Sequence, residues 1–357
     1  MRVLFLLVSM WSAVAFAAEP VPMSPGLHED IVFDAQTPLA TNREILRRML
    51  SPLLAARVGA ELVAAGQSPD AQIVDLAGER FAYYVPAGAP PKEGYGLLVF
   101  VPPWNEALIP KKWFSVLDRQ GVVLVTLKNA GNRANVLGRR VPLALNAYEN
   151  IRRRFPIDAR RTYVGGFSGG SRVALRIVSG YPDVFRGALL NSSTHDFGTA
   201  GLPLPEPKLM DTLESDVRLV FATGTRDVEN VAIDRHVRDS ARALCITDIV
   251  TLSMRDLDHT EVDAPTLDRA LRELDAPRKA DDRTACHAKR ASDLDARARQ
   301  VEAAIDAHEA DKAAAELDAL DEYFGALAAP RSVELKARVD ALHSSATANG
   351  DANPMPR

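Results

Sequence analysis

The sequence predicts an α/β fold built on a mostly parallel central sheet. Short apolar runs rich in Val recur along the middle of the chain, for example at 97–101, 122–127 and 217–222. Such runs are typical of strands that are buried on both faces of a parallel sheet. Segments with helical spacing separate these runs, and a regular alternation of strands and helices indicates an α/β fold.

The chain begins with a segment that we interpret as a signal peptide. Arg2 precedes an apolar run that continues to Phe16, and the small residues Ala15 and Ala17 suit cleavage after Ala17. The run is shorter than the roughly 20 residues that a membrane span requires. We therefore expect residues 1–17 to be removed, which leaves a periplasmic or secreted protein without a membrane span. A retained N-terminal anchor is the alternative.

The segment 18–71 is predicted to be an N-terminal helical extension. Apolar residues recur at helical spacing from about Asn42 to Val63. Ser51 followed by Pro52 is a typical start of a helix, because proline suits the first helical position. The segment therefore contains two helices or one kinked helix.

The segment 72–277 is predicted to be the catalytic domain. A turn at Ala77-Gly78 predicts a β-hairpin between a strand at 73–74 and one at 81–85. Further strands are expected at 97–101, 122–127, 162–164, 187–190, 217–222 and 249–252, and helices at 113–119, 143–154, 171–179 and 264–274.

Beyond Pro277 the composition changes to Ala, Asp, Glu, Lys and Arg with helical periodicity, which predicts a C-terminal helical hairpin over 278–343. Pro330 separates its two helices. The hairpin either packs on its own domain or binds a protein partner. The small and polar residues of 344–357 predict a disordered tail.

Composition excludes several classes of function and partner. Lys and Arg total 43 against 47 Asp and Glu, so the balanced surface gives no reason to expect binding to nucleic acid. Cys245 and Cys286 suffice for one disulfide in an oxidising compartment, with two free thiols as the alternative. No residues near Cys286 complete a set of metal ligands, so we expect no metal site.

Ser168 is the candidate nucleophile. It lies in Gly166-Phe167-Ser168-Gly169-Gly170, which satisfies the pattern G-x-S-x-G. The pattern falls between a predicted strand and a predicted helix, where a strained turn exposes the serine hydroxyl above the sheet.

A serine hydroxyl needs a base to take its proton, and the base needs an acid to orient it. In this kind of site the chain order is serine, acid, histidine. Asp227 follows the strand 217–222 in a tight turn and is the preferred acid, with Glu229 as the fallback. His259 follows the strand 249–252 and is the preferred base.

Three segments resemble the esterase and polyhydroxybutyrate-depolymerase group of the α/β hydrolases. They are Arg-Phe-Ala-Tyr-Tyr-Val-Pro at 80–86, the serine turn at 165–170, and Tyr-Pro-Asp-Val-Phe at 181–185. The similarity extends over about 72–274. It implies the α/β-hydrolase fold and hydrolysis of carboxylic esters through an acyl-enzyme, without a metal or an organic cofactor.

The sequence departs from that group at the expected oxyanion hole. The group usually carries His-Gly after the strand at 97–101, whereas this chain has Pro102-Pro103. The backbone N–H of Gly169 supplies one donor, but prolines have no N–H, so the second donor must come from Trp104 or Asn105.

Phe167, His195 and Asn129 are candidates for binding the substrate. His195 follows the strand 187–190, and Asn129 follows the end of another strand, so both side chains can reach the mouth of the site or lie on surface loops. The segment 196–215 is either a small lid or a connector.

Three functions are consistent with these residues. The first is an esterase that acts on a small-molecule or polymeric ester. The second is a peptidase or amidase with the same three residues. The third is a non-catalytic binding protein, in which Ser168 and His259 would lie beyond hydrogen-bond reach of each other.

Overall fold

The computed structural model describes residues 23–278 and 281–350, with side chains described up to Ser344. Within these residues, eight strands form one sheet in the order β1-β2-β4-β3-β5-β6-β7-β8. β1 and β4 each pair antiparallel with β2, and all other neighbours are parallel. This mostly parallel sheet confirms the predicted α/β-hydrolase fold. The strands are β1 (Gly26–Ile31), β2 (Phe81–Val85), β3 (Tyr95–Val101), β4 (Val122–Leu127), β5 (Ile157–Phe167), β6 (Gly187–Asn191), β7 (Arg218–Gly224) and β8 (Ile249–Met254).

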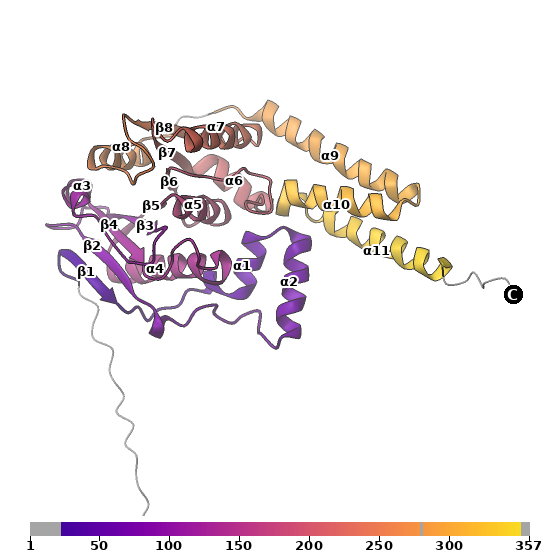
Figure 1. Cartoon of the computed structure of the whole chain (residues 1–357), viewed down its shortest axis with the longest axis horizontal. Helices are drawn as coiled ribbons and strands as arrows, with labels where there is room; N and C mark the ends of the chain where they lie inside the picture. Colours follow the sequence, from indigo (N-terminus) through magenta and orange to yellow (C-terminus); the bar gives the residue numbers. More distant parts are fainter. Residues whose placement is uncertain (1–22, 279–280, 351–357) are drawn as a thin grey trace, which may run out of the picture.

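Helices cover both faces of the sheet (Figure 1). Side chains of α3 and α8 pack on one face, and those of α4, α5 and α7 pack on the other. Successive residues of β3 alternate between these two cores, as expected of a strand that is buried on both faces. The helices of this part are α3 (Phe114–Gln120), α4 (Val141–Arg154), α5 (Gly169–Gly180), α6 (Pro207–Asp216), α7 (Val228–Ala243) and α8 (Ala264–Asp275).

The predicted β-hairpin is wrong. Residues 73–74 are not a strand, and the antiparallel partner of β2 at the edge of the sheet is β1, with Leu27 opposite Tyr84. β1 lies within the segment expected to be helical. It contains His28, Glu29 and Asp30 and is only partly buried, so it lacks the apolar pattern that marks the central strands.

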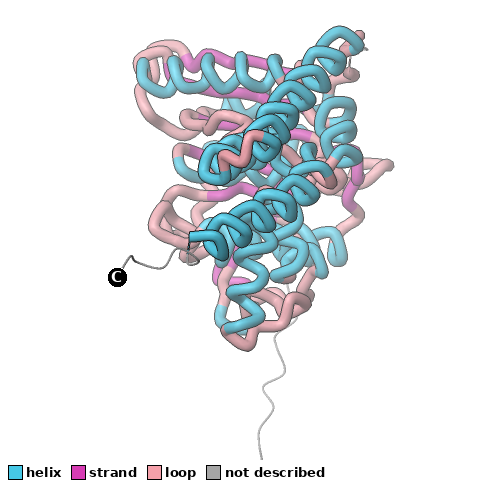
Figure 2. Tube along the Cα trace, turned by 90° about the vertical axis from the view of Figure 1, so that its right-hand side faces the viewer, coloured by secondary structure: helices cyan, strands magenta, loops and turns pink. Residues whose placement is uncertain are grey.

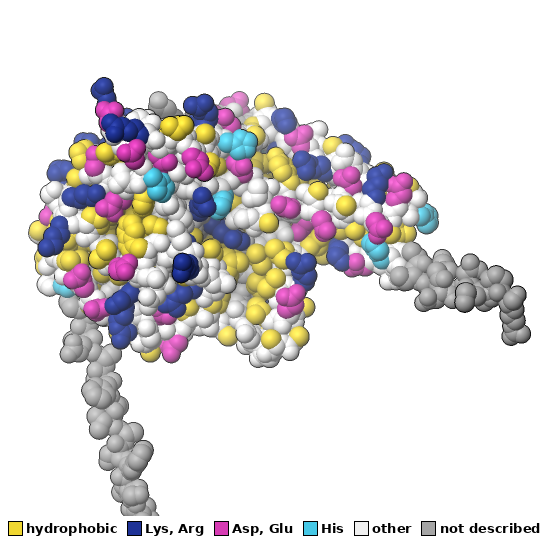
Figure 3. All heavy atoms as spheres, in the orientation of Figure 1, with side chains coloured by type: hydrophobic (Ala, Val, Ile, Leu, Met, Phe, Trp, Pro, Cys, Tyr) yellow, Lys and Arg dark blue, Asp and Glu magenta, His cyan; other side chains and the backbone are white. Residues whose placement is uncertain are grey.

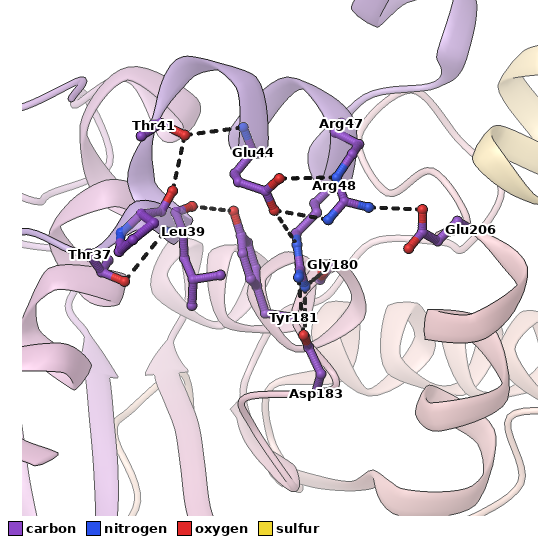
Figure 4. Close-up of polar contacts among 11 residues, drawn as sticks. Thr37, Leu39, Thr41, Glu44, Arg47, Arg48, Gly180, Tyr181, Asp183 and Glu206 are labelled. Carbon is purple, nitrogen blue, oxygen red and sulfur yellow. Dashed lines mark hydrogen bonds and ion pairs between the residues drawn. The ribbon is translucent and has the colours of Figure 1, made fainter. Parts of the chain in front are cut away.

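The remaining N-terminal segment forms two helices, α1 (Asn42–Met49) and α2 (Pro52–Ala64), with Pro52 at the start of the second. Figure 4 shows how α1 attaches to the residues that follow α5. The hydroxyl of Tyr181 donates to the carbonyl of Leu39 at 2.8 Å, and Arg48, with only 8% of its side chain exposed, pairs with Asp183 at 2.7 Å. This segment therefore braces the far end of the helix that begins beside Ser168.

The C-terminal region contains three helices, which we call the C-terminal arm: α9 (Thr284–Asp306), α10 (Ala310–Phe324) and α11 (Arg331–Gly350). The sequence predicted two, and a turn at 307–309 divides the first of these. α11 continues into the segment 344–357 that was expected to be disordered. The rest of that segment and the expected signal peptide at 1–17 lie outside the described residues.

The arm packs against its own domain, where α11 contacts α2, and Figure 2 shows the molecule from the side on which the arm lies. The N–H of Leu53 donates to Asp321 at 3.4 Å, and the N–H of Ala326 donates to the carbonyl of Leu204 at 2.9 Å. Gly198 lies so close to Tyr323 that a side chain there would clash. The arm therefore supports the loop 196–205 from outside.

A disulfide joins Cys245, just after α7, to Cys286 in the first turn of α9. The buried carboxylate of Glu214 on α6 also pairs with Arg290 of α9 at 2.5 Å. These two links hold the start of the arm to the sheet domain. Among the described residues, none of the helices combines the length and apolar character that crossing a membrane requires.

Candidate active site

Ser168 occupies the turn between β5 and α5. Its backbone has φ 53° and ψ −124°, a conformation that residues other than glycine rarely adopt. This conformation lifts the hydroxyl above the sheet. Gly170 allows this turn, because a Cβ there would overlap the carbonyl oxygen of Val101. The helix begins at Gly169, two residues before the predicted start, so its first N–H groups face the site.

The three predicted catalytic residues form one hydrogen-bonded chain. Ser168 Oγ lies 2.9 Å from His259 Nε2, and His259 Nδ1 lies 2.7 Å from Asp227 Oδ2. Asp227 is buried at the end of β7, whereas the fallback Glu229 is exposed on α7. The loop that carries His259 packs closely on the end of β7, since a Cβ at Gly224 would overlap the carbonyls of that loop.

Two asparagines that the sequence analysis missed hold this chain of residues in place. The side-chain amide of Asn230, on the first turn of α7, donates to Asp227 Oδ1 at 2.8 Å and lies 3.2 Å from His259 Nδ1. The sequence does carry a signal for Asn230. It lies three positions after Asp227 at the start of a helix, and this spacing places the two side chains on the same face.

Asn191, at the end of β6, is 1% exposed and connects the two catalytic loops. Its carbonyl accepts from the Ser168 N–H at 2.8 Å. Its side chain donates to the carbonyl of Thr260 at 3.2 Å and accepts from the N–H of Val262 at 2.9 Å. No local motif marks this residue, because its partners are up to 71 positions away.

The oxyanion side of the site lies between α5 and the loop after β3. The side-chain oxygen of Asn105 accepts from the Gly131 N–H at 3.3 Å, so this oxygen stabilises the loop. Among the described residues, no hydrogen bond engages the backbone N–H of Gly169 or that of Trp104. These two N–H groups, and that of Asn105, which also has no hydrogen bond among the described residues, are candidate donors, while the side-chain oxygen of Asn105 faces the neighbouring loop.

Arg140 connects the loop after β3 to the start of α5. Its guanidinium donates to the carbonyl of Pro102 at 2.8 Å and to that of Gly169 at 3.3 Å. Only 2% of Arg140 is exposed, and burial lowers its pKa to about 10. The bonds fix the spacing between the loop 102–105 and the start of α5.

Aromatic residues form one wall of the site. The ring of Phe167 lies 4.9 Å from that of His259 and 6.1 Å from that of Trp104, centre to centre. Asn129 does not line the site. It lies in the turn after β4, where its N–H donates to the carbonyl of Asn105 at 2.6 Å. Asn132, further along the same loop, packs directly on Gly169 instead.

A cavity of about 490 Å³ opens beside the nucleophile. Its lining residues are Asn132, Val136, Arg140, Ser168, Gly169, Arg172, Val173, Arg176, His195 and Gly201. His195 is thus part of the site. The side chain of His195 is partly open to solvent. Burial of the rest of its ring and the positive charges of Arg172 and Arg176 lower the pKa of His195.

No protein-family model and no curated protein matches the chain. Solved structures do match it, at low identity. A fluorophosphonate-binding serine hydrolase of Staphylococcus aureus is 11% identical, with a TM-score of 0.45 over 56% of this chain and 93% of that one. A poly(3-hydroxybutyrate) depolymerase of Bordetella parapertussis is 17% identical, with a TM-score of 0.42 over 57% and 85%.

A thermostable esterase is 13% identical, with a TM-score of 0.38 over 50% of this chain. The match spans about half of that esterase, 51% of its length. At these identities the function of the chain depends on its own residues, in which a serine, a histidine and an aspartate meet above the sheet of an α/β-hydrolase fold.

Proposed function

We propose that the chain is an exported serine hydrolase that cleaves carboxylic esters through an acyl-enzyme on Ser168. The observation that carries this proposal is the chain of hydrogen bonds from Ser168 through His259 to Asp227, at 2.9 and 2.7 Å. A non-catalytic binding protein would not need this alignment, and that hypothesis required the first of these distances to be long.

The reaction follows from these positions. His259 Nε2 takes the proton of the Ser168 hydroxyl as Oγ attacks the acyl carbonyl, and Asp227 stabilises the imidazolium that forms. The N–H groups of Gly169 and Trp104 donate to the developing oxyanion. His259 then gives the proton to the leaving alcohol. Water, deprotonated by the same imidazole, attacks the acyl-enzyme and releases the acid and free Ser168.

Export is supported by the disulfide between Cys245 and Cys286, because disulfides persist in oxidising compartments. N-terminal sequencing of the protein recovered from the periplasm or the medium tests this part of the proposal. We expect the mature chain to begin at Ala18. A protein that is recovered in the cytoplasm with residues 1–17 attached would contradict export.

The catalytic part is tested by labelling with a fluorophosphonate, followed by mapping of the modified peptide. We expect one label, on Ser168, and hydrolysis of 4-nitrophenyl acetate that is lost in Ser168→Ala. Folded protein that neither reacts with the probe nor hydrolyses the ester would refute the proposal. Comparison of an ester with the amide of the same acid then distinguishes an esterase from an amidase or peptidase.

A further inference from the structure

The cavity beside Ser168 has an unusual charge. Three arginines line it, namely Arg140, Arg172 and Arg176, and no acidic residue does. On the face shown in Figure 3, dark blue basic side chains and a cyan histidine gather near the middle. Two of the arginines, Arg172 and Arg176, project from α5, on which they follow Ser168 by about one and two turns.

None of the three arginines forms an ion pair with another described residue. Arg172 donates to the hydroxyl of Ser193 at 2.7 Å, and Arg176 donates to the carbonyl of Met49 at 2.7 Å. Arg140 donates only to the two carbonyls of Pro102 and Gly169. Their partners are therefore neutral, and their positive charges remain uncompensated within the cavity.

Two arginines of low exposure elsewhere in the described chain do have acidic partners. Arg218 pairs with Asp248 at 2.7 Å, and Arg48 pairs with Asp183 at the same distance. Such pairing is the rule, because a desolvated charge without a counter-ion is costly. Burial lowers the pKa of Arg176 to about 10, and its Nε has no hydrogen-bond partner among the described residues. The described residues that line the cavity therefore supply no counter-ion for these charges.

The acidic residue of the adjacent cavity, Asp196, does not form an ion pair with these arginines. Asp196 lines the adjacent cavity, which Arg172 and His195 also border, and its carboxylate lies 3.2 Å from His236. Burial and the positive charges of Arg172 and Arg176 lower the pKa of His195, so its neutral form is favoured and it adds an uncharged polar group to the cavity.

We propose that this cavity recognises a carboxylate on the ester substrate, so that the protein prefers esters that carry a negative charge near the bond to be cleaved. The proposal rests on the proposed esterase function and adds its substrate class. A guanidinium binds a carboxylate through two parallel hydrogen bonds, and such charge-assisted bonds are stronger than neutral ones. The position of the cavity beside Ser168 and Gly169 allows the charged group and the reacting carbonyl to be held together.

Two pairs of substrates test the proposal and show which half of the ester carries the charge. Mono-4-nitrophenyl glutarate and 4-nitrophenyl pentanoate differ in a carboxylate on the acyl side. The butanoate esters of 3-carboxy-4-nitrophenol and 4-nitrophenol differ in a carboxylate on the alcohol side. We expect kcat/KM for the anionic member of one pair to exceed that of its neutral partner by about tenfold or more, and added salt to reduce this ratio.

Variants connect the preference to the cavity. Arg172 is exposed, so Arg172→Gln should fold, and we expect it to lower the ratio of anionic to neutral kcat/KM by about threefold to tenfold. Arg172→Lys keeps the charge and should retain most of the ratio. Arg269→Gln removes an equally exposed arginine of α8, outside the cavity, and should leave both rates unchanged.

A binding measurement decides the question even without turnover. Calorimetry on Ser168→Ala should show that mono-4-nitrophenyl glutarate binds more tightly than 4-nitrophenyl pentanoate. Adding Arg172→Gln to this variant should weaken the binding of the glutarate. Equal rates and equal binding for both members of each pair would overturn the proposal, as would a ratio that Arg172→Gln leaves unchanged. Failure of Ser168 to react with a fluorophosphonate would instead refute the esterase function, so the two failures are distinguishable.

Discussion

Replacing Asn191 by alanine should displace the proposed base, His259, from the hydroxyl of the proposed nucleophile, Ser168. Four hydrogen bonds of the buried Asn191 side chain are at stake. It donates to the carbonyls of Ala222 and Thr260 and to the hydroxyl of Ser192, at 2.9, 3.2 and 3.0 Å, and it accepts from the N–H of Val262 at 2.9 Å. Thr260 directly follows His259, so the substitution acts on the backbone that positions the imidazole.

The size of the effect follows from the groups left without partners. The carbonyl of Ala222 keeps its bond from the N–H of Ser192, whereas Thr260 and Val262 each lose a partner. Each unsatisfied buried group costs about 1 to 3 kcal/mol, so the two groups predict a loss of roughly 2 to 6 kcal/mol in the free energy of unfolding. Displacement of His259 by about 1 Å should lower kcat about a hundredfold.

The assay combines denaturant unfolding with the turnover of 4-nitrophenyl acetate. Asn150→Ala is the matched control, because the Asn150 side chain is also buried and bonds both backbone groups of Ala35, and its hydrogen-bond partners include none of Ser168, Asp227 and His259. We expect Asn150→Ala to lower stability comparably without lowering kcat. Wild-type kcat in Asn191→Ala, or an equal loss of kcat in the control, would refute this account of how the base is positioned.

Three further outcomes are expected. Asp227→Asn should lower kcat for 4-nitrophenyl acetate by about four orders of magnitude, because His259 would lose the acceptor that fixes its tautomer; a loss of less than about tenfold would contradict this role. Replacing both Cys245 and Cys286 by serine should lower the free energy of unfolding by about 4 kcal/mol in the chain-entropy model, since the disulfide spans 41 residues; unchanged denaturant midpoints would count against it. Burial raises the pKa of Asp234, whose protonated form is therefore favoured in the folded state, and its contribution to stability is lost as pH rises through that pKa. Asp234→Asn should thus gain stability relative to the wild type as pH rises above the ordinary pKa of an aspartate, about 4, and a pH-independent difference would oppose this.

The central strands and the catalytic residues could be predicted because their signals are local. The residues of β3 and β4 are buried throughout and, apart from Thr126, are not polar, as is typical of strands buried on both faces. Ser168 lies in a turn whose glycines are dictated by close backbone approach, and the order of the serine, the acid and the base along the chain restricts the partners.

The elements that the sequence did not reveal depend on distant contacts. β1 is an edge strand with polar residues, and its position is set by pairing with β2, some fifty residues later in the chain. Asn191 and Arg140 are ordinary polar residues in the sequence, and their roles arise only when folding brings separate loops around them. Asn129 and Asn132 follow the same strand, and nothing in their spacing indicates which one would face Gly169.

The C-terminal arm has a consequence for how the chain can be shortened. The arm is the outer support of the loop 196–205, and Gly201 of this loop lines the cavity that holds Ser168. Ending the chain at residue 277 would leave the sheet and the three catalytic residues in place but would remove the partner of Gly198 and Leu204. The loop that borders the cavity is thus held by a part of the chain that contains none of Ser168, Asp227 and His259, so the hydrogen-bonded chain and the wall of its cavity depend on different segments.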